Sequence, residues 1–139
     1  MALYGKEHIA RYEATDGKEG HKWNDTQALL LTTKGRKSGE PRVSPLVYDL
    51  HRGDYVVVAS KGGAPDDPAW YKNIKANPEV EVQVWGDKFT ANARTANAEE
   101  RKQIWPKMAA EWPDYDNYQK KTDREIPVVI LEREGAERK

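Results

Sequence analysis

The chain has 139 residues, the length of one domain, and its 23 Lys and Arg residues balance its 23 Asp and Glu residues. This neutral charge argues against a general nucleic-acid-binding protein, and the absence of cysteine excludes disulfides and thiolate metal sites. The three histidines, His8, His21 and His51, lack the spacing of metal ligands, so we expect surface positions for them and no metal site.

The first 26 residues are polar and predict an N-terminal arm that is either a short helix around Lys6–Glu13 or a loose segment. The arm holds no apolar stretch long enough for a signal peptide or a stable membrane span, so we expect a cytoplasmic protein. Ala28–Thr33 is a continuous apolar run that predicts a buried strand, and Val43–Leu50 predicts a second strand after a turn. Pro45 cannot donate to a sheet ladder, so we expect it at an edge or a bulge.

The rest of the chain alternates strand and helix patterns. Asp67 and Asn97 are the expected N-caps of two helices. Six strands joined mostly by short turns imply antiparallel pairing, and we expect a mainly β protein with helices (α+β) whose strands close into a small barrel or half-barrel. The further strands are expected at Tyr55–Ala59, Val80–Trp85, Lys88–Thr95 and Pro127–Leu131, and the helices at Pro68–Ala76 and Ala98–Trp112.

The turn Lys34–Arg42 holds four cations and one anion in nine residues. Its two glycines let backbone N–H groups converge, and Ser38 adds a hydroxyl. Such a loop can hold a phosphate or a carboxylate through backbone donors together with Lys and Arg. It is not a Walker loop, and on spacing alone a solvated hairpin turn is the alternative interpretation.

A second segment of interest follows the strand Tyr55–Ala59. The strand runs directly into Ser60-Lys61-Gly62-Gly63, where the glycines allow the backbone to approach a flat ring closely and Ser60 and Lys61 can donate to ring carbonyls. A serine nucleophile is a weaker hypothesis, because the GxSxG elbow is absent. The alternative is a strand end that leads into a flexible loop.

Aromatic residues mark two further places. Trp70 and Asn73 share the short helix after this loop, where Trp70 is either part of a ligand pocket or a core anchor. Trp112, Tyr115 and Tyr118 are three residues apart, so on a helical turn they share one face. They either wall a ligand cleft or cap the barrel as core residues. A tyrosine hydroxyl can donate a proton or a hydrogen bond at neutral pH.

Three stretches together resemble the deazaflavin-dependent nitroreductases and quinone reductases, a split β-barrel family that uses coenzyme F420. The stretches are LLLTTKGRKSGEPRVSPL (Leu29–Leu46), VVVASKGGAPDDPAWYKNIKANPEVEV (Val56–Val82) and WPDYDNYQKKTDREIPVVIL (Trp112–Leu131). The resemblance implies a six-stranded antiparallel split barrel, similar to FMN-binding proteins, over a single cofactor-binding domain of residues 1–139.

The resemblance also implies a function and site residues. The expected reaction is hydride transfer from reduced F420 to an electron-poor acceptor such as a quinone, a nitroaromatic or an unsaturated lactone. By motif position, the cofactor-binding residues are Arg36, Lys37, Ser38 and Arg42 for the phosphate and tail carboxylates, with Pro45, Val58, Ala59, Ser60, Lys61, Gly62, Trp70 and Asn73 along the rest of the pocket. The expected substrate-binding residues are Trp112, Tyr115 and Tyr118, and the expected catalytic residues are Ser60, Tyr115 and Tyr118.

Trp112 stands where a tyrosine can occur in the family, and it has no hydroxyl to donate. We therefore expect quinone-type acceptors ahead of nitroimidazoles. The alternatives are an FMN-binding oxidoreductase and a non-catalytic F420 carrier. The expected partner is a small-molecule acceptor and not a nucleic acid, and the protein is expected to be a monomer or a homodimer, because strand edges are exposed.

Overall fold

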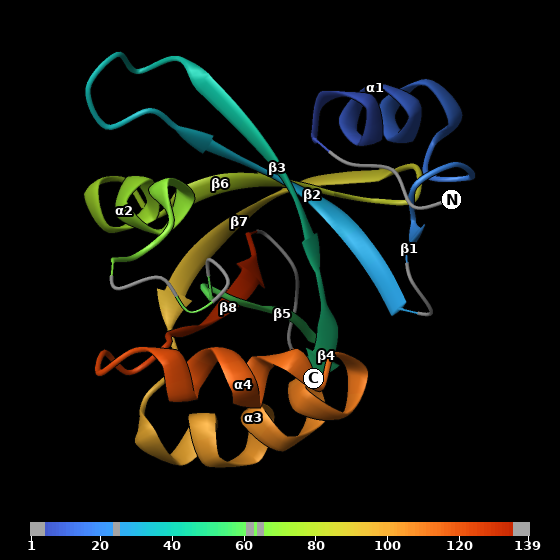
Figure 1. The fold of residues 1–139 in the computed structure, drawn as a ribbon. Helices are drawn as coiled ribbons and strands as arrows, with labels where there is room; N and C mark the ends of the chain where they lie inside the picture. Colours follow the sequence, from blue (N-terminus) through green and yellow to red (C-terminus); the bar gives the residue numbers. More distant parts are fainter. Residues whose placement is uncertain (1–4, 24–25, 61–62, 64–65, 135–139) are drawn as a thin grey trace.

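The computed structural model describes residues 5–23, 26–60, 63 and 66–134 (Figure 1). Four helices and eight strands follow one another along this part of the chain. They are α1 (Gly5–Thr15), β1 (Lys22–Trp23), β2 (Thr26–Lys34), β3 (Pro41–Val47), β4 (Asp49–His51), β5 (Asp54–Val58), α2 (Ala69–Ala76), β6 (Glu79–Val84), β7 (Asp87–Thr95), α3 (Ala98–Glu111), α4 (Asp114–Lys121) and β8 (Val128–Arg133). Every strand pair is antiparallel, as the short connections predict.

The sheet closes into a barrel because the bent segment formed by β3 and β4 pairs with a different strand at each end. β3 pairs with β2, and β4 pairs with β5. The strand order is β1-β2-β6-β7-β8-β5-β4, and β3 pairs with β2. Only Tyr48 separates β3 from β4, and its backbone N–H donates to the Gln27 carbonyl at 3.2 Å. The predicted strand Val43–Leu50 is therefore two strands, and the expected count of six is too low. Six remain when β3 and β4 are counted once and the two-residue β1 is set aside.

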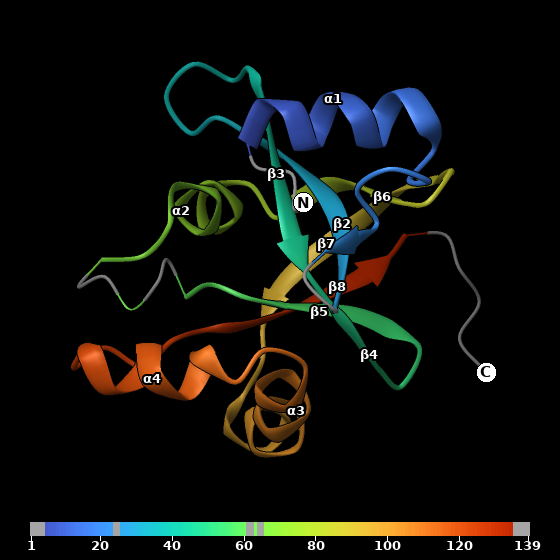
Figure 2. The ribbon, with the colours of Figure 1, turned by 45° about the vertical axis from the view of Figure 1, so that its right-hand side comes forward.

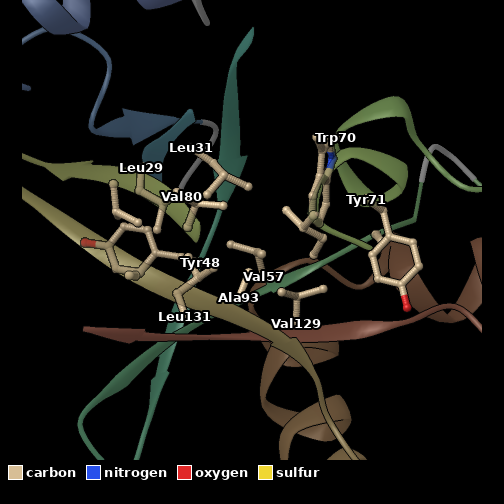
Figure 3. Packing of buried hydrophobic residues seen from close by; sticks show 14 of the residues in the cluster. Leu29, Leu31, Tyr48, Val57, Trp70, Tyr71, Val80, Ala93, Val129 and Leu131 are labelled. Carbon is tan, nitrogen blue, oxygen red and sulfur yellow. The ribbon is translucent and has the colours of Figure 1, made fainter. Parts of the chain in front are cut away.

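The strands β5 and β8 are buried on both faces, which explains their uninterrupted apolar sequences. Val57 and Val129 pack inside the barrel, in the cluster shown in Figure 3. Their neighbours Val56 and Val128 point the other way, because successive side chains of a strand alternate between faces. Figure 2 shows α3 and α4 on the side of the barrel opposite α1. Val56 and Val128 pack there with Ile104 and Met108 of α3, and these residues belong to a second core cluster outside the barrel.

The N-terminal arm is packed onto the barrel through α1, so of the two alternatives for this arm the helix around Lys6–Glu13 is the one that forms. The Tyr12 side chain is fully buried. Its hydroxyl donates to the Ala28 carbonyl at 3.0 Å and accepts from the Trp85 backbone N–H at 2.9 Å. One tyrosine thus joins α1 to β2 and to the β6–β7 turn.

The prediction that the three histidines lie on the surface is wrong. His8, His21 and His51 are only 3%, 8% and 7% exposed. Each ring has a polar partner that sequence spacing does not reveal: the Gly20 carbonyl for His8 (2.7 Å), the Tyr48 hydroxyl for His21 (2.7 Å) and the Lys107 ammonium for His51 (3.3 Å). A buried imidazole with a hydrogen-bond partner is compatible with the core.

The two predicted helix starts have different outcomes. Asn97 caps α3 as predicted, with a capping box: its side chain accepts from the Glu100 N–H at 2.9 Å, and the Glu100 carboxylate accepts from the Asn97 N–H at 3.0 Å. Asp67 is not the N-cap of α2; Pro68 occupies that position. The Asp67 carboxylate instead accepts from Arg124 Nη1 at 3.1 Å.

The Arg94–Glu100 pair predicts a pH dependence of stability. Both guanidinium Nη atoms of Arg94 donate to the Glu100 carboxylate at 2.7 Å, and this hydrogen bonding lowers the pKa of Glu100 to about 2. The pKa of this carboxyl is lower in the folded state than in the unfolded state. Its ionised form therefore stabilises the fold at pH values above the unfolded-state pKa, and this contribution is lost as the pH falls through the folded-state pKa. Because solvent screens this partly exposed pair, we expect the free energy of unfolding to fall by only about 1 kcal/mol between about pH 4.5 and pH 2.

Urea unfolding of wild type and Glu100→Gln across this pH range measures the effect. The wild type should lose about 1 kcal/mol more than the variant as the pH falls. Glu99→Gln is the matched control, because Glu99 is an exposed acid in the same first turn of α3. Equal pH dependence in all three proteins would contradict the assignment.

Candidate functional site

The basic turn is the closed tip of the β2–β3 hairpin. The strands pair up to Lys34 and Pro41, and the Gly35 N–H donates to the Glu40 carbonyl at 2.8 Å. The Gly39 N–H donates to the Gly35 carbonyl at 2.8 Å, and Gly39 has a φ of +75° that favours glycine. These bonds fix the backbone of the tip. The side chains exposed on it are Arg36, Lys37, Ser38 and Glu40.

Asn73 of α2 fastens the basic turn to the body of the protein. Its side-chain oxygen accepts from the Arg36 backbone N–H at 3.2 Å and from Arg36 Nη1 at 2.9 Å. Its side-chain nitrogen donates to Thr33 Oγ1 at 3.1 Å. Asn73 is 3% exposed, so this buried amide satisfies its own polar groups while it orients the Arg36 guanidinium.

A cavity of about 270 Å³ lies between the basic turn, β3 and α2. It brings together six of the predicted cofactor-binding residues: Arg36, Lys37, Ser38, Arg42, Trp70 and Asn73. Gly35, Ser44 and Ala69 also line it and were missed. Ser44 could have been found from its spacing, because it is two residues after Arg42 on the same strand and therefore shares its face.

The fourth cation of the turn faces elsewhere. Lys34 lines a different cavity of about 220 Å³, together with Glu79 and Glu81 of β6. Alternate residues of β2 point to opposite sides of the sheet, and Thr33, next to Lys34, is the one bonded to Asn73. The positive charge of the first cavity therefore comes from three cations, and no Asp or Glu is among its described lining residues.

Several predicted cofactor-binding residues do not line this cavity. Pro45 pairs with Leu30, and strand alternation places it on the face opposite Arg42 and Ser44. Val58 and Ala59 are buried in the two core clusters, so any contact with a ligand comes from their backbone. Ser60 is partly exposed at the end of β5. Lys61 and Gly62 lie outside the described residues.

The three aromatic residues near α4 gather as the spacing predicts. Tyr115 and Tyr118 have ring centroids 6.2 Å apart, and Trp112 Nε1 donates to the Tyr118 hydroxyl at 3.4 Å. Tyr115 is only 5% exposed and belongs to the second core cluster, and burial raises its pKa. Tyr118 is half-buried at the edge of the same cluster.

Comparison with known proteins identifies the family. The family model for F420H(2)-dependent quinone reductase matches residues 4–133. The chain belongs to this family. It is therefore an F420H2-dependent reductase with reduced coenzyme F420 as its cofactor, as the three sequence motifs predict.

Relatives and solved structures agree with this assignment. An F420H2-dependent quinone reductase of Mycobacterium tuberculosis (strain H37Rv) is 39% identical over 135 residues, which are 91% of this chain and 87% of the relative. A solved F420-H2 dependent reductase (FDR-A) is 46% identical with a TM-score of 0.70, over 76% of this chain and 93% of that chain. A structure described as a domain-swapped dimer is 41% identical with a TM-score of 0.73, over 91% and 96% of the two chains. The expected split-barrel class is confirmed.

The residues of the basic cavity fit the anionic part of F420. Three cations and two serine hydroxyls face a space without an acidic side chain among its described residues. The cradle is also tight, since a Cβ on Gly35 would fall 2.9 Å from Ser38 Oγ. Pockets that enclose a whole drug-sized ligand have about 300–1,000 Å³, so this cavity suits the phosphate and tail carboxylates and not the entire cofactor.

Two further features are absent from the described ranges. None of the helices placed there combines the length and the apolar character needed to cross a membrane. The same ranges hold no group of three or more His, Asp or Glu side chains arranged to bind a metal ion.

Proposed function

We propose that this reductase passes electrons from reduced F420 to a quinone-type acceptor and binds the phosphate and tail carboxylates of F420 in the basic cavity. The observation that carries the proposal is the hydrogen bond between Asn73 and Arg36. It fixes the Arg36 guanidinium at the wall of the cavity that lies between the basic turn and α2. When bound, reduced F420 supplies a hydride from its deazaflavin ring. The protein supplies binding, orientation and exclusion of water.

Within the cavity the roles divide by chemistry. Arg36, Lys37 and Arg42 neutralise the phosphate and carboxylates, and Ser38 and Ser44 donate hydrogen bonds to them. Trp70 of α2 offers an apolar wall beside them and is itself 8% exposed. The backbone of Val58 and Ala59, together with Lys61 and Gly62, remains our proposal for contacts with the ring.

Ser60 and Tyr118 are the proposed catalytic residues on the acceptor side. The Ser60 hydroxyl hydrogen-bonds the acceptor oxygen as negative charge develops there. Tyr118 donates the proton, because it is partly exposed and its hydroxyl is oriented by Trp112. Tyr115 is the less suitable donor of the two, since its buried ring supports Tyr118 from the core. Nitroaromatics and unsaturated lactones are secondary acceptors.

A homodimer is the proposed assembly. The neighbour described as a domain-swapped dimer is 41% identical to this chain, which supports pairing of two copies. Within the described residues β3 pairs with β2 alone, which leaves its other edge available for pairing. Sedimentation of the purified protein tests this proposal.

Binding and turnover assays test the proposed function. Titration of the purified protein with F420 and with FMN should show tight binding of F420 and weak binding of FMN. Anaerobic oxidation of F420H2 should be faster with a benzoquinone or naphthoquinone than with a nitroimidazole. F420 binding without turnover on any acceptor would favour a carrier, and preferential FMN binding would overturn the proposed cofactor site.

A further inference from the structure

Arg124 lies in the segment between α4 and β8 and contacts two parts of the chain far away in sequence. Its Nη2 donates to the Ser60 carbonyl at 2.8 Å, and its Nη1 donates to the Ala59 carbonyl at 3.2 Å. Nη1 also donates to the Asp67 carboxylate at 3.1 Å. The Arg124 side chain is 14% exposed, so these bonds are largely shielded from water.

The two contacted parts are those that present the proposed site residues. Ser60 lies two residues after the end of β5, and its carbonyl also accepts from the Gly63 N–H at 2.9 Å. Asp67 precedes Pro68, the N-cap of α2, which is the helix that carries Trp70 and Asn73 into the basic cavity. A single guanidinium therefore joins the end of β5 to the start of α2.

We propose that Arg124 is a positioning residue for F420 binding, which acts by holding Ser60 and the start of α2 in a fixed relation. The inference rests on the proposed function, in which the backbone of Ala59 contacts the F420 ring and Trp70 and Asn73 of α2 line the cavity for its anionic part; Arg124 bonds to the Ala59 carbonyl and to Asp67 before α2. The planar fork of arginine can donate to two carbonyls and a carboxylate at once, whereas the single ammonium of lysine cannot reproduce this geometry. Charge-assisted hydrogen bonds are also stronger than neutral ones.

Arg101 provides a matched control. Its Nε and Nη2 donate to the Ile126 carbonyl at 3.3 and 3.2 Å, and Nη2 donates to Gln119 Oε1 at 3.0 Å. It therefore holds the same segment between α4 and β8, through the same kind of contact. These bonds reach neither Ser60 nor Asp67, so Arg101 separates positioning of the site from general support of the segment.

The test compares Arg124→Lys with Arg101→Lys, and both with wild type. The first readout is exchange of the Gly63 and Tyr71 amides by NMR in the cofactor-free protein, because these N–H groups bond to the Ser60 and Pro68 carbonyls. The second is the dissociation constant for oxidised F420, from the fluorescence of F420. We expect the exchange rates of the two amides and the dissociation constant to rise about tenfold in Arg124→Lys. In Arg101→Lys we expect all of them to stay within about twofold of the wild-type values.

Asp67→Asn gives an independent variant that keeps an acceptor for Arg124 and removes its charge. We expect an intermediate rise in both quantities. Equal changes in Arg124→Lys and Arg101→Lys would overturn the proposal, and so would faster exchange with unchanged F420 affinity. Failure of the wild type to bind F420 would instead refute the proposed function, and it is detected before any variant is compared.

Discussion

Replacement of Arg36 and Lys37 together by alanine is expected to raise the dissociation constant for F420 about a hundredfold or more. Each removes a charge-assisted hydrogen bond to an anion, worth about 1.5–3 kcal/mol, and every 1.4 kcal/mol is a factor of about ten. The substitution of Arg36 also removes one of the two bonds to the buried Asn73 side-chain oxygen, so only the backbone N–H of residue 36 still fastens the turn to α2. Fluorescence titration with F420 measures the change.

Lys34→Ala and Lys37→Ala form the matched pair for this experiment. Each removes one positive charge from the same hairpin, but Lys34 lines the opposite cavity beside Glu79 and Glu81. We expect less than a threefold change for Lys34→Ala and about tenfold or more for Lys37→Ala. Equal effects would show that the turn acts only through its overall charge. Added salt should shrink the effect of the Lys37 change, because it screens exposed charges.

The fold could be predicted from local patterns because its strands carry clear signals. The alternation in Val80–Trp85 and the apolar runs Ala28–Thr33 and Tyr55–Ala59 match the strands that form. The division of Val43–Leu50 at Tyr48 could not be predicted, since it depends on pairing with two strands that are far apart in the sheet. The turn Lys34–Arg42 was predicted as an anion site, but the opposite direction of Lys34 follows only from strand pairing.

The parts of the site that sequence reasoning missed are contacts between distant segments. Asn73 was predicted as a pocket residue, yet its bond to Arg36 spans 37 positions. Arg124 reaches Ser60 over 64 positions, and its own neighbours in sequence give no sign of the site. Tyr115 shares its spacing with Tyr118, but only the packing of α3 and the sheet shows that its ring is buried. Residue type and spacing cannot encode these pairings, because tertiary contacts decide them.

Gly63→Ala is expected to destabilise the protein by about 2–5 kcal/mol. Gly63 has a φ of +81°, in the region that costs other residues about 1–2 kcal/mol. A Cβ there would also lie 2.6 Å from the Tyr118 carbonyl oxygen and 2.9 Å from the Tyr118 Cα, so backbone must move. Overpacking of this kind costs about 1–3 kcal/mol more. Urea unfolding measures the total.

Gly53→Ala separates the two contributions, because Gly53 has a φ of +84° but no atom within 4 Å of an added Cβ. It should cost about 1–2 kcal/mol and leave turnover unchanged. Gly63→Ala should cost more and also lower turnover with quinones about tenfold or more, since it pushes α4, and with it Tyr118, away from the segment that begins at Ser60. Equal destabilisation by the two substitutions would show that the contact with α4 gives way without strain. Normal turnover in Gly63→Ala would argue that Ser60 and Tyr118 do not act on the same acceptor.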